Sequence, residues 1–268
     1  MKKIIAIVFT LLFVIAIGGG LAGCYGFNGF NGFDNIIGSQ NLETREYTFT
    51  GFDRVEILAP FDVEMARSNV YLVSVTVDDN LFDYVEVTQI GDTLRLRLKP
   101  FISFRHSTFR ATITLPELRS LELSGASTVD AARFQTTGDV YINVSSASRL
   151  DMMSLQASSV TMEVSAASRV IGFIKTEAAD FQVSGASSIE LSGSAEGAQL
   201  EASGASSLRL RNFYILHASV NLSGASNGNV EVNGNLNVAV SGASSLTFGG
   251  NPTLGQVEVS GASSLNRR

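Results

Sequence analysis

Short runs of alternating apolar and polar residues fill the chain between residues 121 and 265, and a recurring Ser-Gly-Ala-Ser tetrapeptide separates them. The alternation has the period of two that is typical of half-buried β-strands. The first serines of the eight tetrapeptides lie 18 to 21 residues apart. Such spacing indicates a solenoid, in which each repeat is one coil that packs on its neighbours. The consensus of leucine-rich repeats, which have a similar period, is missing. We therefore predict an all-β fold, a right-handed parallel β-helix (solenoid) with about 19–20 residues per coil over residues 121–265.

A second alternating pattern, without the tetrapeptide, covers residues 45–120. Gly91 and Asp92 predict a hairpin turn between two of its runs. Six runs are bounded by Gly, Asp, Asn or Pro, and each run predicts one strand. The six runs are YTFTGFDRVEIL, FDVEMA, YLVSVTVDD, YVEVTQI, LRLRLK and FRATITL. We predict a β-strand-rich N-terminal section that is continuous with the β-helix.

Stacked coils place equivalent tetrapeptide positions above one another, so each position becomes a column of side chains. Serine hydroxyls donate and accept hydrogen bonds, either along a column or to corner backbone groups. The second position is Gly in six copies but Ser146 and Ala166 in two, which indicates that small size matters more there than a positive φ. We predict that the first-position serines form a structural corner ladder: Ser124, Ser145, Ser165, Ser184, Ser203, Ser223, Ser241 and Ser260.

The N-terminus has the layout of a secretory signal, with two lysines followed by an apolar run from Ile4 to Ile17. The run ends in LAGC, which resembles the lipobox of bacterial lipoproteins. Cys24 is the single cysteine of the chain and cannot form an internal disulfide. We predict a lipoprotein signal peptide over residues 1–23, lipidation of Cys24, and a flexible Gly/Asn/Phe tether over residues 24–44. An ordinary cleaved signal and an uncleaved anchor are the alternatives.

Composition and charge narrow the class of protein. With 45% apolar and 16% charged residues the chain can bury a core, and its 25 glycines, 4 prolines and absence of tryptophan favour short strands and tight turns. The formal net charge is −6, and removal of Lys2 and Lys3 with the signal makes it more negative. Nucleic acid, which demands a basic surface, is therefore excluded as a partner, whereas the membrane is a predicted partner through the lipid. The predicted location is extracytoplasmic, in a bacterial cell envelope, and the oligomeric state is open.

The sequence contains few of the residue combinations that enzymatic catalysis requires. A serine nucleophile needs a base, and the chain has only His106 and His217. Polysaccharide lyases also use β-helices, but the acidic residues of the repeats stand singly, without a calcium-binding cluster. Arg149 and Arg169 follow the fourth serine in adjacent coils and are candidate surface binding residues for an acidic glycan. The alternative is that these cations keep the rod soluble and block sideways strand pairing. We predict no enzyme, no cofactor and no metal site.

The segments GFDRVEILAPFDVEM at 51–65 and DDNLFDYVEVTQIGDTLRLRL at 78–98, with the tetrapeptide series, resemble the putative autotransporter adhesin head GIN domain family of bacterial lipoproteins. The resemblance covers roughly residues 44–265. It implies a β-helical, cell-surface or periplasmic domain with no established enzymatic activity. The predicted function is a lipid-anchored surface for binding or adhesion, with an envelope protein or a glycan as ligand. A self-associating envelope scaffold is the alternative, and a glycan-cleaving β-helix enzyme is the third reading.

Overall fold

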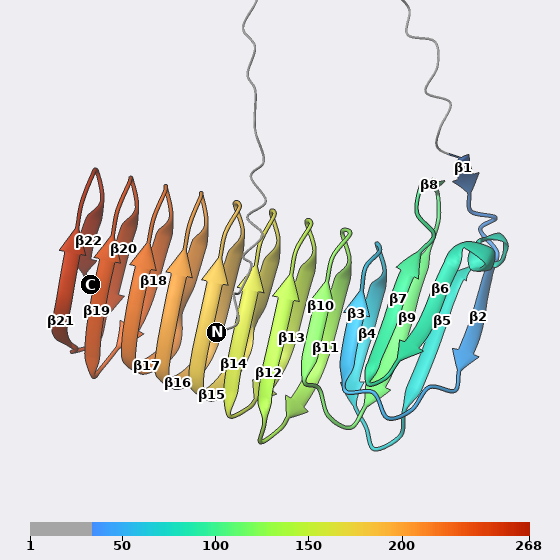
Figure 1. The fold of residues 1–268 in the computed structure, drawn as a ribbon, viewed down its shortest axis with the longest axis horizontal. Helices are drawn as coiled ribbons and strands as arrows, with labels where there is room; N and C mark the ends of the chain where they lie inside the picture. Colours follow the sequence, from blue (N-terminus) through green and yellow to red (C-terminus); the bar gives the residue numbers. More distant parts are fainter. Residues whose placement is uncertain (1–33) are drawn as a thin grey trace, which may run out of the picture. The chain divides into compact units, whose positions relative to one another are not determined.

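Two β-sheets wound from the same coils run through residues 34–268, the part of the chain that the structure, a computed structural model, describes (Figure 1). Each coil of the solenoid contributes one strand before the tetrapeptide and one after it. The strands before it pair in parallel to form sheet 1, and those after it form sheet 2. About seven such turns lie between residues 120 and 267, which confirms the predicted β-helix.

The solenoid strands differ in whether they break at the side opposite the tetrapeptide. Three of them bend around that side without interruption and so belong to both sheets: β15 (Arg169–Val183), β16 (Ser188–Ala202) and β17 (Ser207–Leu222). The other strands of sheet 1 are β10 (Ser120–Leu123), β12 (Asp139–Val144), β14 (Ser159–Val164), β19 (Asn235–Val240) and β21 (Thr253–Val259). The other strands of sheet 2 are β11 (Thr128–Gln135), β13 (Arg149–Gln156), β18 (Asn227–Val232), β20 (Ser245–Gly249) and β22 (Ser264–Arg267).

The N-terminal section extends both sheets, as the sequence predicted, and each of the six predicted runs contains one strand. These are β3 (Arg54–Ile57), β4 (Asp62–Arg67), β5 (Leu72–Asp78), β6 (Val85–Ile90), β7 (Thr93–Leu98) and β9 (Phe109–Leu115). β3 pairs with β10, and β4 with β11, in parallel; residues 58–61 (LAPF) join them where later coils have the tetrapeptide. The predicted hairpin is confirmed between β6 and β7, with Gly91 at φ +61°.

Antiparallel strands close the N-terminal end of the two sheets. β6 pairs with β7 at the end of sheet 1, and β5 pairs with both β9 and β2 (Leu42–Tyr47) at the end of sheet 2. A 3₁₀ helix, η1 (Asp79–Tyr84), links β5 to β6. Antiparallel pairing reverses the chain direction, so the parallel coils do not continue past this end.

Part of the predicted tether belongs to the folded body. β1 (Asp34–Ile37) pairs in parallel with β8 (Ile102–Arg105), and β2 begins at Leu42. Backbone hydrogen bonds to these partner strands therefore fix residues for which the Gly/Asn-rich composition had predicted a flexible tether. Residues 24–33 of the tether, Cys24 and the signal segment lie outside the described residues.

The core lies between the two sheets and is one continuous apolar cluster. Alternate residues of each strand point inward, as in β12 and β14, so every coil adds aliphatic side chains above those of the coil before it. Phe52 and Phe61 are buried in the N-terminal section, and Phe181 and Phe213 contact each other in the solenoid with tilted rings at a centroid distance of 5.9 Å. The shared core joins the N-terminal section to the solenoid.

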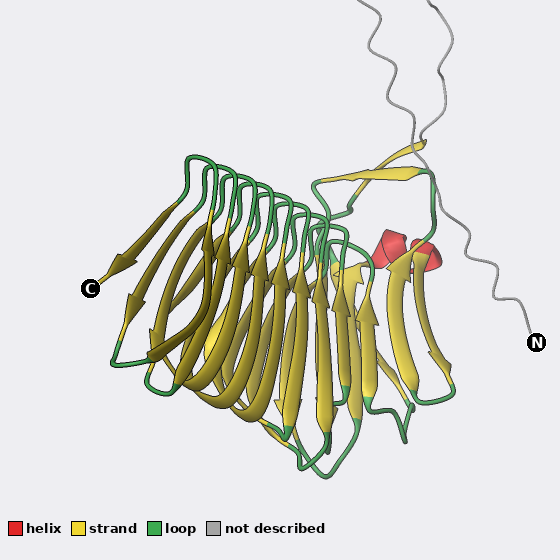
Figure 2. Cartoon of the chain, turned by 60° about the vertical axis from the view of Figure 1, so that its left-hand side comes forward, coloured by secondary structure: helices red, strands yellow, loops and turns green. Residues whose placement is uncertain are grey.

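The tetrapeptides form a row of turns along one edge of the sheets (Figure 2). The second position has a positive φ in every copy, and this holds for Ser146 (φ +57°) and Ala166 (φ +54°) as well as for the glycines. The inference that small size matters more than a positive φ was therefore wrong: both substitutions adopt the left-handed conformation, at a cost of about 1–2 kcal/mol per residue.

The hydrogen bonds between these turns reverse direction partway along the row. In the early coils the third-position N–H donates to the next coil, as from Ala147 to the Ala166 carbonyl at 2.8 Å. In the later coils it donates to the preceding coil, as from Ala243 to the Gly224 carbonyl at 2.7 Å. The change falls between Ala186, which has φ +64°, and Ala205, whose φ is not positive.

This reversal explains where the glycine can be replaced. In the later coils the second-position carbonyl points at the next turn, and a Cβ on Gly224 would lie 2.6 Å from the Gly204 oxygen. In the early coils that carbonyl points the other way, and a Cβ on Gly185 would lie no closer than 3.0 Å to Ala166. Ser146 and Ala166 both belong to the early coils, where a side chain fits.

Candidate functional site

The first-position serines lie at the ends of the sheet 1 strands. Their backbone N–H groups continue the strand ladder, as from Ser165 to the Val144 carbonyl at 2.9 Å. Their side chains are half-buried or, at Ser203 and Ser260, exposed. The structure therefore stacks all eight in one row, where their backbone groups make the regular contacts.

The buried polar column is formed instead by the fourth-position serines. Those of the first seven coils are at most 2% exposed: Ser127, Ser148, Ser168, Ser187, Ser206, Ser226 and Ser244. In the early coils the N–H of one serine donates to the hydroxyl of the next, as from Ser148 to Ser168 Oγ at 3.2 Å. In later coils the hydroxyl donates within its own turn, as from Ser226 Oγ to the Ser223 carbonyl at 2.8 Å. The signal for this column was in the sequence, because the fourth serine lies two residues before an inward-facing residue of the next strand.

Arg149 and Arg169 are register partners on the outer face of sheet 2, as their sequence positions indicated. Each guanidinium contacts a carboxylate of the same chain: Arg149 pairs with Asp151 at 2.6 Å, and Arg169 with Glu190 at 3.0 Å. The hydrogen bond to Asp151 and the charge of that carboxylate raise the pKa of Arg149. Both side chains remain nearly half exposed, so an acidic ligand would have to compete with these carboxylates.

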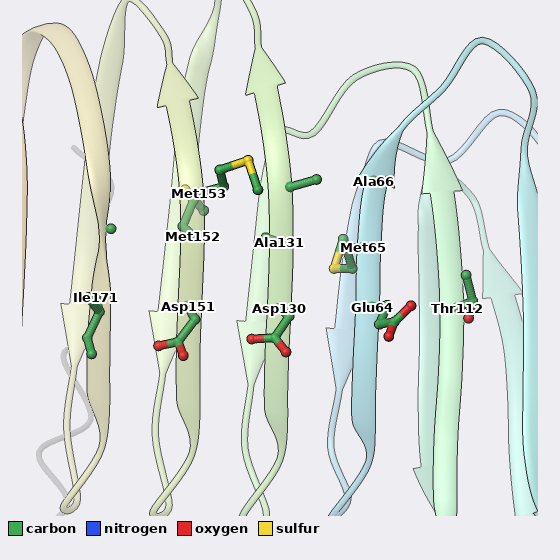
Figure 3. Close-up of a pocket in the computed structure, with 12 residues that line it drawn as sticks. Glu64, Met65, Ala66, Thr112, Asp130, Ala131, Asp151, Met152, Met153 and Ile171 are labelled. Atoms are coloured by element: carbon green, nitrogen blue, oxygen red, sulfur yellow. The ribbon is translucent and has the colours of Figure 1, made fainter.

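The outer face of sheet 2 also carries a groove that sequence reasoning did not anticipate, with a volume of about 700 Å³ (Figure 3). We call it the sheet 2 groove. It crosses β4, β9, β11, β13 and β15, and its lining is Glu64, Met65, Ala66, Thr112, Asp130, Ala131, Ala132, Asp151, Met152, Met153, Ile171 and Gly172. Met153 is 65% exposed and contributes an apolar side chain to the wall of the groove.

A bend in the strands of sheet 2 shapes the groove. In β13 two residues, Met153 and Ser154, stand between the inward-facing Met152 and Leu155, whereas β15 has Phe173 alone at this level. Met153 points outward by the alternation of the strand, as Phe173 does at the same level of β15. Gly172 lets β15 pass close to the Met152 backbone, which a Cβ would meet at 2.8 Å. The sequence signal was the coil of 20 residues that begins at Ser145, followed by one of 19.

Carboxylates line one side of the groove in a single column. Glu64, Asp130 and Asp151 are successive register partners on β4, β11 and β13, and Figure 3 shows them side by side. Adjacent parallel strands are about 4.8 Å apart, so these like charges are close neighbours. Asp151 has Arg149 as a counter-ion, while Glu64 and Asp130 make no ion pair within residues 34–268. The groove therefore combines an apolar wall with excess negative charge.

A second concavity adjoins this groove beyond Met153, with a volume of about 610 Å³. It is lined by Arg67 and Arg133 together with Phe134, Phe173 and polar side chains. Arg67 donates from Nε to the Pro116 carbonyl at 3.0 Å. Along the strands of sheet 2, the outer face thus presents an acidic zone, then an apolar zone and then a basic zone. Each zone spans several neighbouring strands.

The described residues contain no group of three or more His, Cys, Asp or Glu side chains placed to hold a metal ion. None of the helices in this part of the chain is long and apolar enough to cross a membrane.

Comparisons with solved structures identify the same fold in several bacterial proteins. A protein of Parabacteroides distasonis described as a "putative lipid binding protein" superposes with a TM-score of 0.83 at 19% identity, covering 88% of this chain and 100% of that one. A "putative adhesin" of Parabacteroides merdae gives 0.81 at 18% identity, with 88% and 99% covered. A "putative adhesin" of Bacteroides fragilis gives 0.69 at 19% identity, with 87% and 100% covered. None of the curated proteins matches the sequence.

The sequence itself matches one protein family over residues 51–252, which begin just before β3 and end just before β21. This span includes the LAPF turn, the strands β5, β6, β7 and β9, and seven of the eight tetrapeptides. The match agrees with the resemblance found in the segments at 51–65 and 78–98. The chain belongs to the family described as "Putative auto-transporter adhesin, head GIN domain".

Proposed function

We propose that this protein is a lipid-anchored, non-enzymatic binding protein of the bacterial cell envelope that holds its partner in the sheet 2 groove. The observation that carries the proposal is the groove itself, about 700 Å³ with the exposed Met153 at its wall. Concave surfaces with an apolar lining and a few polar groups are the usual ligand sites of proteins. Membership in an adhesin-like family supports a binding role.

The lining also supports a role without catalysis. The groove offers three carboxylates but no histidine, lysine, arginine or cysteine. The lining therefore lacks the histidine or lysine base that usually activates a serine, threonine or cysteine nucleophile. The arrangement suits the holding of a cation-bearing, partly apolar surface better than bond cleavage.

The anchor is the second part of the proposal. Lipidation of Cys24 would place the folded body outside the cytoplasm and close to a membrane surface. Metabolic labelling with an alkyne fatty acid is expected to label the wild-type protein and to fail with Cys24→Ser, which should appear in the soluble fraction. Equal labelling of both proteins would contradict lipidation at this residue.

Partner binding is tested with beads that carry the wild-type protein or Met153→Glu, presented to cells and isolated envelope components. We expect the wild type to retain a partner. Beads that carry Met153→Glu should bind at least tenfold less of this partner, because a charged side chain replaces the apolar one in the wall. Ile90→Glu is the matched control, since Ile90 is 62% exposed on the β6–β7 hairpin of sheet 1. Identical binding by both variants would remove the groove from the proposal.

The carboxylate column gives a stability signature for the same site. Like charges on neighbouring strands are destabilising, so Asp130→Asn is expected to raise the free energy of unfolding by a few tenths of a kcal/mol at low salt while weakening partner binding. The gain should shrink in 0.5 M NaCl, which screens exposed charges. Glu201→Gln is the control, because its register neighbours, Gln182 and Asn221, are uncharged. A stability loss in Asp130→Asn would show that the column is not repulsive.

A further inference from the structure

A second groove lies on the outer face of sheet 1, with a volume of about 550 Å³. We call it the sheet 1 groove. It crosses the sheet 1 portions of β14, β15, β16, β17 and β19, so five successive coils contribute to it. It shares no lining residue with the sheet 2 groove.

One unbroken column of polar side chains runs along this groove. Its members are register partners from coil to coil: Thr161, Asp180, Gln199, Ser219 and Asn237. Neighbours in such a column are about 4.8 Å apart. Asp180 is half-buried and makes no ion pair within the described residues. The next three members of the column, Gln199, Ser219 and Asn237, are exposed. The column therefore offers hydrogen-bonding groups to an outside molecule at the repeat of the coils.

The lining of the groove contains a glycine with open surroundings. Gly197 stands in the middle of β16, in register with Ala178 and His217, and its φ is not in the left-handed region. A Cβ added there would meet no atom within 4 Å. Glycine inside a strand costs about 0.5–1 kcal/mol relative to alanine. Crowding does not explain this glycine, and a glycine inside a strand marks either a bend of the strand or a site where a ligand approaches the backbone closely.

His217 lines the groove, and a backbone hydrogen bond fixes one of its ring nitrogens. Its Nδ1 accepts a hydrogen bond from the backbone N–H of Asn235 at 3.1 Å. The neutral imidazole then carries its proton on Nε2. His217 and Asp180 both line the groove, together with the amides and hydroxyls of the column, which can both donate and accept.

The lining selects a class of ligand. It contains one carboxylate and no lysine or arginine, which disfavours phosphates and acidic polymers. Its apolar residues are alanines, a glycine and Val160, which are too small to form an extended apolar surface for a lipid chain. Dense groups that both donate and accept, repeated along an open groove, match a polyhydroxylated chain. We propose that the sheet 1 groove binds an uncharged oligosaccharide that lies along the solenoid axis over Gly197.

The test uses the full chain and defined probes: maltohexaose, cellohexaose and chitohexaose as uncharged oligosaccharides, and hexagalacturonate as the acidic one. Isothermal titration is expected to detect at least one uncharged probe and no hexagalacturonate binding. Gly197→Ile should reduce the affinity at least tenfold without lowering the thermal midpoint, because the new side chain enters open space. Asp180→Ala should reduce it about fivefold or more.

Ile90→Glu is the matched control and should bind the oligosaccharide like the wild type, because Ile90 is exposed and lines neither groove. The sheet 2 proposal is tested separately, with Met153→Glu and the envelope partner. The inference is overturned if no uncharged probe binds up to 10 mM, if only hexagalacturonate binds, or if Gly197→Ile binds as well as the wild type.

Discussion

Single residues show how the tetrapeptide stabilises the solenoid. The fourth serine is buried, and in the early coils its hydroxyl accepts a backbone N–H that would otherwise have no partner. The first serine, by contrast, uses its backbone groups, which any residue would supply. Two serines in one tetrapeptide therefore have different energetic weight.

Ser168→Ala is expected to lower the free energy of unfolding by about 1–3 kcal/mol, because it leaves the Ser148 N–H without an acceptor in the interior. Ser165→Ala, in the same turn, should change it by less than about 0.5 kcal/mol, since that side chain is only half-buried. Urea denaturation followed by circular dichroism measures both. Equal losses in the two variants would show that the buried hydroxyl has no special role.

At the scale of elements, the row of turns consists of two arrays with opposite hydrogen-bond direction. Ala186 is the last third-position residue with a positive φ, and Ala205 begins the array without it. Neighbouring turns of identical sequence, GASS, thus adopt different backbone conformations.

Glycine substitution at these two alanines should have opposite effects. Ala186→Gly relieves a left-handed alanine and is expected to raise the free energy of unfolding by about 0.5–1 kcal/mol, whereas Ala205→Gly adds only chain entropy and should lower it by a similar amount. Thermal and urea unfolding of the pair measure the difference. Shifts of the same sign would mean that the two turns share one conformation.

The sequence predicted the strands and the coil period because alternation and repeat length act locally. It did not predict the reversal of the turns, since the tetrapeptides on both sides of the change are identical and the peptide direction depends on the coil above. The sheet 2 groove was not predicted for a related reason. The extra residue in the coil of Met153 indicates an irregular strand, but only the stacking of the coils shows the groove that forms beside it. Gly197 was one of 25 glycines, and its open surroundings are visible only in three dimensions.

At the scale of the whole molecule, the N-terminal section and the solenoid share one core. Leu96 in β7 and Leu208 in β17 are both fully buried members of the same apolar cluster. β3 and β4 carry the parallel pairing from the antiparallel strands into the coils. The described body is therefore expected to unfold as a coupled unit.

Leu96→Ala and Leu208→Ala should each lower the free energy of unfolding by about 2–5 kcal/mol and should each speed amide exchange in both the N-terminal section and the solenoid. Ile90→Ala, at an exposed position, is the control and should stay within about 0.5 kcal/mol. Hydrogen exchange with mass spectrometry resolves the two regions. Two separate transitions, each sensitive to one substitution, would refute the coupling.

The reversal in the row of turns also bears on how such a rod can change length. Within either array, each turn presents to its neighbours the same donors and acceptors that it receives, so a duplicated coil would fit beside its template without any peptide rotating. A coil moved from one array to the other would have to rotate the peptide between its second and third positions. Growth and shrinkage of the rod by whole coils are thus open on either side of residues 186–205, and that junction is the one place where a copied unit must choose its orientation.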